Sequence, residues 1–182
     1  MSGITLPSAN RIPDKLINAK IYYQGGVELI GVGDCEPPSI EYITESVSGL
    51  GIAGEVTTPV IGHLKELPFK IKWHAPNRQS MSLLTTTMHQ LEVFGSIQYN
   101  DAAAGELDSE AIKIVLRGMP KKVAIGKFEA AKKMDPDLEL ECPYIKIWLG
   151  GDEVLEVDKY AFICRVNGVD LLEKVRQQLG GD

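Results

Sequence analysis

The 182-residue sequence has few cysteines, few aromatic residues and no long hydrophobic run. Its three cysteines, Cys35, Cys142 and Cys164, form no CxxC pair and lack the spacing of metal ligands, so we expect free thiols in a reducing compartment. No apolar stretch approaches the ~20 residues that cross a bilayer. No basic segment followed by an apolar one marks a signal peptide. We therefore expect a soluble protein that is synthesised in the cytoplasm.

Large clusters of basic residues are also missing. The densest are the pairs Lys121 with Lys122 and Lys132 with Lys133, and the net charge is −6. A surface that binds duplexes needs grouped Lys and Arg to displace counterions from phosphate. Sequence-specific binding of nucleic acid is therefore not expected. Acidic residues gather at 106–110, 135–141 and 152–158, and such groups are typical of solvated faces and turns.

What the chain does contain is enough apolar material for a core. Hydrophobic residues make up 44% of the sequence and charged residues 24%, which is ordinary for a globular protein. The length fits one domain. No internal repeat or low-complexity linker divides it, so we expect a single domain over residues 1–182.

Apolar and polar residues alternate with a period of two in several segments. Residues 69–73 place Phe69, Ile71 and Trp73 on one face and two lysines on the other, as in a half-buried strand. The other segments with strand character are 16–23, 27–32, 91–99, 112–117, 123–128, 138–142, 145–149, 154–157 and 160–164. Turn signals separate them at 24–26, 104–105, 118–120 and 150–152. About nine short strands predict a mainly β fold, an antiparallel β-sandwich or barrel.

A helical pattern is clear at the C-terminus. Its apolar stripe is formed by Leu171, Leu172, Val175 and Leu179. Asn167 or Asp170 could cap the start of this helix, and Gly180 suits the left-handed residue that follows a helix end. A shorter helical turn is predicted at 79–84.

Residues 49–54, Gly49-Leu50-Gly51-Ile52-Ala53-Gly54, match the G-x-G-x-x-G pattern of dinucleotide-binding sites. Such a site needs a buried strand before the glycines and a helix directly after them, whose N–H groups meet the pyrophosphate. Here residues 55–62 are β-branched and include Pro59, which favours extended backbone. The acid expected about 20 residues further on is replaced by His74. We therefore predict no nucleotide site.

No catalytic or metal-binding pattern is visible elsewhere. His63, His74 and His89 form no H-x-H, H-E-x-x-H or Cys/His cluster, and they are interpreted as surface or packing residues. No serine or cysteine lies in a recognisable nucleophile context. The sequence predicts a protein that is not an enzyme and that needs no cofactor or metal.

Residues 47–61 form an unusual segment, rich in glycine and uncharged apart from Glu55. A solvent-facing loop should be polar, and an apolar exposed segment usually marks an interaction surface. We therefore predict a long glycine-rich loop that pairs with a neighbouring chain, although a plug folded over the barrel mouth also fits. The predicted inter-subunit residues are Val47, Leu50, Gly51, Ile52, Ala53, Val56, Val60 and Ile61.

Several segments, taken in order, resemble the major tail tube protein family of contractile-tailed phages and R-type bacteriocins. They are residues 12–18, 47–55, 59–63, 116–121, 126–127, 153–159 and 167–170, followed by the final helix. The resemblance covers roughly residues 12 to 180 and leaves residues 1–11 as an N-terminal extension. Met119 stands where the family pattern leads us to expect leucine, a swap of similar volume.

The resemblance implies a structural subunit that forms hexameric rings, stacked into a hollow tube for DNA or ion passage. The implied partners are other copies of the chain and the sheath, tape-measure, baseplate and tail-terminator proteins, in a virion tail or bacteriocin particle. An acidic channel wall would repel phosphate and let DNA slide, and Glu106, Asp108 and Glu110 are the predicted lumen-facing residues.

Two other functions remain open from the sequence, and a third, an enzyme built on a β-sandwich, would need a cluster of polar residues that the sequence does not show. A monomeric small-molecule-binding β-barrel of lipocalin type would use the glycine-rich loop as a lid. The tube of a type VI secretion system has a similar architecture and resembles these segments less. Phage and bacteriocin tubes are not distinguished.

Overall fold

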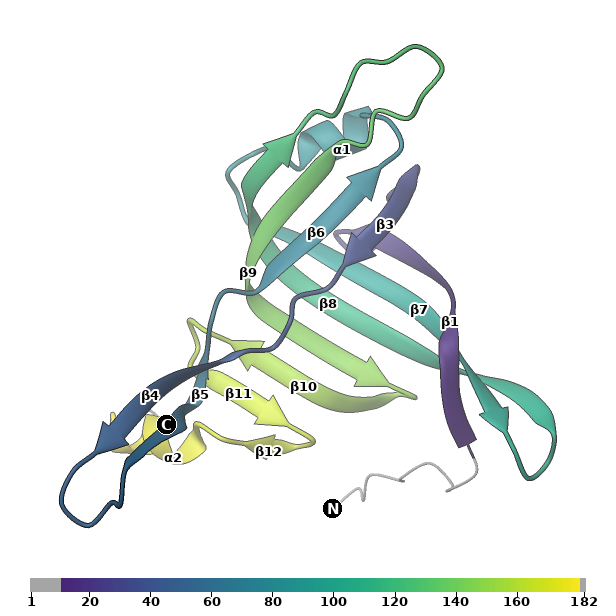
Figure 1. Ribbon diagram of the computed structural model, residues 1–182. Coiled ribbons are helices and arrows are strands. Elements are labelled where there is room, and N and C mark those ends of the chain that lie inside the picture. The colour runs from purple at the N-terminus through teal and green to yellow at the C-terminus, as the bar shows by residue number, and fades with distance from the viewer. Residues whose placement is uncertain (1–10, 181–182) are drawn as a thin grey trace.

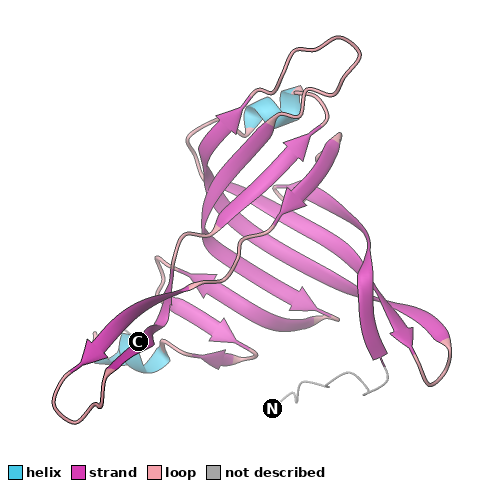
Figure 2. Cartoon of the chain, in the orientation of Figure 1, coloured by secondary structure: helices cyan, strands magenta, loops and turns pink. Residues whose placement is uncertain are grey.

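The protein is mainly β, with antiparallel sheets and two short helices, one of them at the C-terminus (Figures 1 and 2), which confirms the predicted fold class. The structure is a computed structural model that describes residues 11–180. Of the predicted N-terminal extension, residues 1–10 lie outside the described part, and Arg11 is the first residue of strand β1. None of the described helices is long and apolar enough to cross a membrane.

Residues 11–180 contain twelve strands, more than the predicted nine or so. The strands are β1 (Arg11–Tyr23), β2 (Val27–Glu28), β3 (Val32–Glu36), β4 (Tyr42–Ser48), β5 (Glu55–Leu64), β6 (Pro68–Trp73), β7 (His89–Asp101), β8 (Glu106–Ala124), β9 (Asp137–Leu149), β10 (Asp152–Asp158), β11 (Ile163–Val166) and β12 (Val169–Asp170). The helices are α1 (Arg78–Ser82) and α2 (Glu173–Gln178).

Ten of these strands form one strongly bent sheet, and β4 and β5 form a separate two-stranded sheet. The main path of the large sheet runs β12-β11-β10-β9-β8-β7-β1-β2, and β3 and β6 form a branch from β9. All pairs are antiparallel, and most join neighbours in the sequence. The pairs β1–β7, β3–β6 and β6–β9 join distant segments, and they close the sheet around its core.

Strand β9 is where the sheet branches. Along one edge it pairs with β8, and along the other edge its first half pairs with β6 and its second half with β10. The change of partner falls at Cys142 and Pro143. Because proline has no N–H to donate, it suits the point where one ladder ends and the next begins. The N–H of Cys142 instead donates to the carbonyl of Leu67 at 3.1 Å.

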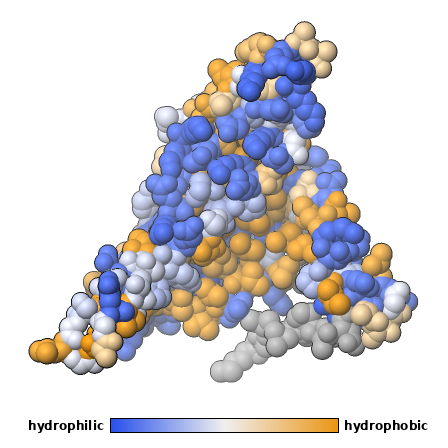
Figure 3. All heavy atoms as spheres, in the orientation of Figure 1, coloured by the Kyte–Doolittle hydropathy of each residue, from blue (hydrophilic) through white to orange (hydrophobic). Residues whose placement is uncertain are grey.

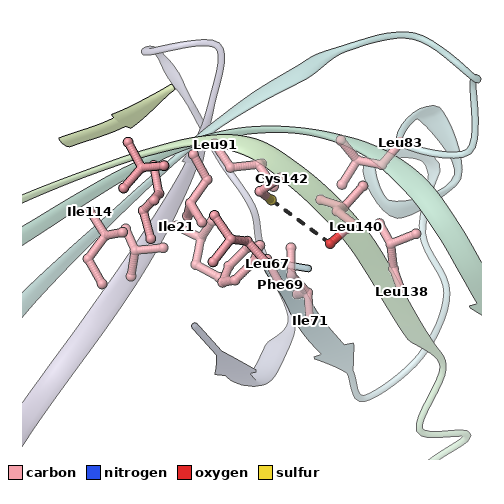
Figure 4. Packing of buried hydrophobic residues seen from close by; sticks show 14 of the residues in the cluster. Ile21, Leu67, Phe69, Ile71, Leu83, Leu91, Ile114, Leu138, Leu140 and Cys142 are labelled. Atoms are coloured by element: carbon pink, nitrogen blue, oxygen red, sulfur yellow. Dashed lines mark hydrogen bonds between the residues drawn. The ribbon is translucent and has the colours of Figure 1, made fainter. Parts of the chain in front are cut away.

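The core lies between the bent sheet and the β3–β6 branch. The predicted alternation in residues 69–73 is confirmed, since Phe69, Ile71 and Trp73 are almost fully buried and the lysines between them point outward. Figure 4 shows Phe69 and Ile71 packed with side chains from β1, β7, β8 and β9. Burying a large apolar side chain contributes about 1.5–3 kcal/mol, so this cluster is the main source of stability.

The predicted turn at residues 118–120 is wrong. Gly118, Met119 and Pro120 lie inside the 19-residue strand β8, at two register shifts in its pairing with β9. A β-carbon on Gly118 would lie 2.7 Å from the sulfur of Cys142 and 2.9 Å from the carbonyl oxygen of Glu141. The glycine and proline therefore permit a bulge and close backbone approach, not a reversal of the chain.

Other boundaries also differ from the prediction. Residues 112–117 and the first part of 123–128 belong to the single strand β8, and residues 125–136 form the β8–β9 loop. The segments 138–142 and 145–149 are both parts of β9. Residues 160–162 are a turn, and β11 begins at Ile163. The predicted hairpins at residues 24–26 and 150–152 are confirmed.

The C-terminal helix is confirmed, although it is shorter than predicted. Leu172, its N-terminal cap, is buried, and no side chain caps the start, so neither Asn167 nor Asp170 plays the predicted role. Asp170 instead accepts a hydrogen bond from the Leu172 N–H at 3.0 Å. Gly180 follows the helix with φ +82, as predicted. The predicted helical turn near residue 79 is α1.

Candidate functional site

Strands β4 and β5 form a hairpin, residues 42–64, that stands away from the large sheet (Figure 1). We call this hairpin the arm. In its register Val47 lies opposite Val56, and Glu45 lies opposite Thr58, so these four side chains share one face. The other face carries mainly serine and threonine, and the hydroxyls of Ser46 and Thr57 lie 3.1 Å apart. The segment predicted as a long loop is thus a strand pair around a turn at residues 49–54.

The tip of the arm is built from glycines and exposes apolar side chains. Gly51 and Gly54 have φ values of +93 and +124, which glycine adopts without steric cost. Leu50 has a relative exposure of 108%, the largest among the exposed hydrophobic residues of the described chain. Figure 3 shows hydrophobic atoms at the far end of this projection.

The base of the arm is fastened to the C-terminal part of the chain. Gly62 has φ +65, and a β-carbon there would lie 2.5 Å from Cγ of Leu172. Beside it, the rings of His63 and Phe162 meet edge to face with centroids 5.7 Å apart. The base of the arm is therefore held by close packing, while its outer part has no contact with the core cluster.

The structure brings all eight predicted inter-subunit residues together on the arm. Val60 is half-buried near the base, and the other seven are exposed. Their order along the arm places Leu50, Gly51, Ile52 and Ala53 in the turn and the rest on the two strands. Because they serve no core within the described chain, they are available for contact with another molecule. That they form such a contact stays a prediction.

The G-x-G-x-x-G motif lies in the turn of this hairpin. A strand precedes it and an antiparallel strand follows it, so there is no helix N-terminus to receive a pyrophosphate. The extended backbone predicted for residues 55–62 is confirmed, and the motif lacks the strand–turn–helix geometry of a βαβ dinucleotide site.

The three predicted lumen-facing acids lie at the start of β8 and share one face of the sheet. Glu106 is exposed, and Asp108 forms an ion pair with Arg11. Glu110 is half-buried, and its carboxylate lies against Gly150; a hydrogen bond to Glu110 raises the pKa of Tyr99 above its usual value. The three residues therefore form one acidic strip, and whether this strip faces a channel stays a prediction.

Comparison with known proteins assigns the family. The family model described as phage tail tube protein FII matches residues 13–180. The chain belongs to this family. Its members are structural tail components and not enzymes, so the resemblance seen in the sequence is confirmed and the prediction that the chain is no enzyme follows from the family.

One curated relative is similar to this chain in sequence, and one solved structure is similar to it in fold. The tail tube protein of Escherichia phage P2 is 30% identical over 86 residues, which are 47% of this chain and 48% of that protein. The chain thus spans about half the length of that relative in the match. The fold is similar to a sheath/tube terminator of the PVC extracellular contractile injection system in its extended state, with a TM-score of 0.54 at 10% identity. That match covers 75% of this chain and 97% of the other.

Sequence reasoning missed a network of paired charges on one face of the large sheet of this tail tube family member. Lys146 lies 2.8 Å from Glu153 and 3.4 Å from Glu156, and Arg165 contacts both acids. The hydrogen bond from Lys146 lowers the pKa of Glu153 below its usual value. The four residues come from β9, β10 and β11, so only the pairing of the strands reveals that they meet.

A broad groove crosses the same face. Its apolar floor includes Tyr22, Phe94 and Trp148, and Lys113 lies over the rings of Phe94 and Trp148 at 4.9 and 5.5 Å from their centroids. No residue of the arm lines the groove. The lid that a ligand-binding barrel would need is therefore not formed by the glycine-rich segment.

The remaining polar groups of interest are explained by packing. His89 is buried, with Nδ1 3.0 Å from the Tyr23 hydroxyl and Nε2 donating to the Thr85 carbonyl at 2.9 Å. Burial raises the pKa of the Cys142 thiol to about 12, so it is protonated and unreactive at neutral pH. Within residues 11–180 no group of three His, Cys, Asp or Glu side chains could hold a metal ion.

Proposed function

We propose that the chain forms hexameric rings that stack into the inner tube of a contractile tail, with a channel for DNA or ions. Membership of the phage tail tube protein FII family carries this proposal, because the matched region spans nearly all of the described chain. The proposed location is the virion tail or a bacteriocin particle. The proposed partners are other copies of the chain and the sheath, tape-measure, baseplate and tail-terminator proteins.

The unpaired edges of the sheet support assembly into a ring. Strands β2 and β12 end the main path, and β3 ends the branch. Exposed strand edges favour pairing with another chain. A contact between two different surfaces of identical subunits gives a closed ring when its rotation closes. The two faces of such a ring differ, so rings can stack further.

The arm supports contact beyond the single subunit. Its exposed apolar side chains belong to no core, and its base is held firmly, so it presents a defined surface to a neighbour. We propose that the arm reaches an adjacent subunit or the next ring through the eight predicted residues. In the same assembly, Glu106, Asp108 and Glu110 contribute an acidic channel wall that does not retain DNA.

Electron microscopy of the purified, concentrated protein tests this function. We expect rings or tubes in negative stain, and a Leu50→Asp/Ile52→Asp variant should remain folded but form no tubes, because two charges would be buried in the contact. A Leu50→Met/Ile52→Val variant is the matched control and should assemble normally. Normal tubes from the aspartate variant would contradict the role of the arm, and a wild-type monomer at all concentrations would contradict the proposed function.

A further inference from the structure

Two projections lie at opposite ends of the molecule in Figure 1, and they carry opposite charge. One is the arm, residues 42–64, and the other is the β8–β9 loop, residues 125–136. The arm contains two acids, Glu45 and Glu55, and no lysine or arginine, whereas the β8–β9 loop contains three lysines and two acids. Although the net charge of the chain is −6, the arm is acidic and the β8–β9 loop has an excess of lysines over acids.

The charges at these two ends are largely free of partners within the subunit. On the arm, Glu45 and Glu55 form no ion pair with any described residue. On the β8–β9 loop, Lys127, Lys133 and Asp135 likewise form no ion pair with any described residue, whereas Lys132 pairs with Glu129. The charged network between β9, β10 and β11, in contrast, is fully paired. Unpaired charges gathered on projecting segments are available to another molecule.

Each projection also carries an exposed apolar side chain. Leu50 on the arm and Phe128 on the loop, at 108% and 84%, are the two most exposed large hydrophobic residues in the described chain. An apolar contact surrounded by charges of opposite sign is the usual composition of a protein–protein contact. The tip of the arm and the β8–β9 loop are therefore complementary in charge, and each offers an exposed apolar side chain to the contact.

The β8–β9 loop is held in shape at its base. The N–H of Lys127 donates to the carbonyl of Met134 at 2.8 Å, and the N–H of Met134 donates to the carbonyl of His74 at 2.9 Å. Gly126, at φ +92, packs directly against the backbone of Met134. The loop thus presents its lysines and Phe128 from a braced base, which reduces the entropy lost on binding.

We propose that the basic β8–β9 loop of one subunit docks on the acidic arm of a second copy in the next ring, and that this contact sets the polarity of stacking. This inference rests on the proposed function and names one of its contacts. Because the two surfaces are different and lie at opposite ends, the contact is head-to-tail and repeats without limit. If two rings met with the same ends facing, arm would face arm or loop would face loop, and the like charges would repel.

Charge exchange tests the contact in the full-length chain. A Lys127→Glu/Lys133→Glu variant has two acidic ends, and a Glu45→Lys/Glu55→Lys variant has two basic ends. We expect each to lower the mass of sedimentable tubes by about tenfold or more at moderate salt, because like charges would meet at every ring junction. The fourfold variant exchanges both charges and should recover tubes. Wild-type tubes should shorten as salt rises, since screening weakens exposed pairs.

A Lys127→Arg/Lys133→Arg variant is the matched control and should assemble like the wild type. Circular dichroism should show the same fold for all variants, because the substituted side chains are exposed. Undiminished tubes from the loop variant would overturn the contact, as would failure of the fourfold variant to recover tubes. Either result leaves the proposed function intact if the wild type forms tubes, whereas no tubes from the wild type refutes the function itself.

Discussion

Gly62 shows how a single residue positions the arm. Its left-handed backbone and the side chain of Leu172, whose Cγ would lie 2.5 Å from an added β-carbon, leave no room for a side chain. Gly118 acts similarly inside β8, where it permits close approach to Cys142. In both places glycine is required for packing between distant segments, and neither place is a reversal of the chain. The glycines at the tip of the arm, in contrast, have open space around them.

Replacing Gly62 by alanine should therefore destabilise the protein. The positive φ and the collision with Leu172 predict a loss of about 1–3 kcal/mol in the free energy of unfolding. Gly26→Ala is the control, because nothing lies within 4 Å of a β-carbon there. The measurement is the midpoint of urea unfolding with the slope unchanged. Equal midpoints for the two variants would contradict this account of Gly62.

At the scale of an element, the C-terminal helix depends on one ion pair near its start. Arg176 lies 2.8 Å from the carboxylate of Asp170, which is nearly buried, and the Leu172 N–H donates to the same carboxylate. The hydrogen bond from Arg176 holds the pKa of Asp170 below its usual value. A carboxyl with a depressed pKa stabilises the fold above its ordinary pKa, and this contribution is lost as the pH falls through the depressed value.

Asp170→Asn should lower stability near pH 7 by about 1 kcal/mol, and the difference from the wild type should shrink below about pH 4. Asparagine keeps an acceptor for the Leu172 N–H, so the variant isolates the ion pair. Glu106→Gln, at an exposed acid without an ion pair in the described chain, is the control and should change little. Thermal unfolding followed from pH 3 to 7 provides the measurement. A difference that stays constant over this range would refute the role of the ion pair.

At the scale of the whole molecule, the arm and the β8–β9 loop contribute almost nothing to the buried core. The buried cluster draws mainly on β1, β6, β7, β8 and β9, with single residues from β10, β11 and the start of α2, and it includes no residue of the arm before Leu64. The arm and the β8–β9 loop extend from this core in different directions (Figure 1). Folding and assembly therefore depend on different residues. Changes in the arm or the β8–β9 loop should prevent assembly without unfolding the subunit.

Replacing residues 46–57 by Asn-Gly should shorten the arm without harming the fold. The pair Glu45 and Thr58 would flank a two-residue hairpin turn, so the register of β4 and β5 is kept. We expect the free energy of unfolding to change by less than about 1 kcal/mol, and tubes to disappear from electron micrographs. A large loss of stability would show that the outer arm belongs to the folding unit, and normal tubes would show that it has no role in assembly.

Much of this organisation follows from local patterns. The alternation in residues 69–73 predicts a buried strand because its period of two is a property of extended backbone alone. The hairpin turn at Gly150 and Gly151 is predictable for the same reason. The apolar, glycine-rich character of residues 47–61 marks an exposed segment without any knowledge of its shape. The turn expected at residues 118–120 failed because glycine and proline permit a bulge as well as a reversal, and only the partner strand decides between them.

The sequence by itself determined that this protein is β-rich, that its C-terminus is helical and that it resembles the tail tube family. Tertiary structure alone decided that β1 pairs with β7 and β6 with β9, and that β9 changes partner at Cys142 and Pro143. It also decided that the β8–β9 loop lies at the opposite end of the molecule from the arm (Figure 1). The physical reason is that backbone periodicity and turn geometry act between near neighbours in the chain. Strand partners and the position of charges depend on contacts between segments that the sequence does not order in space.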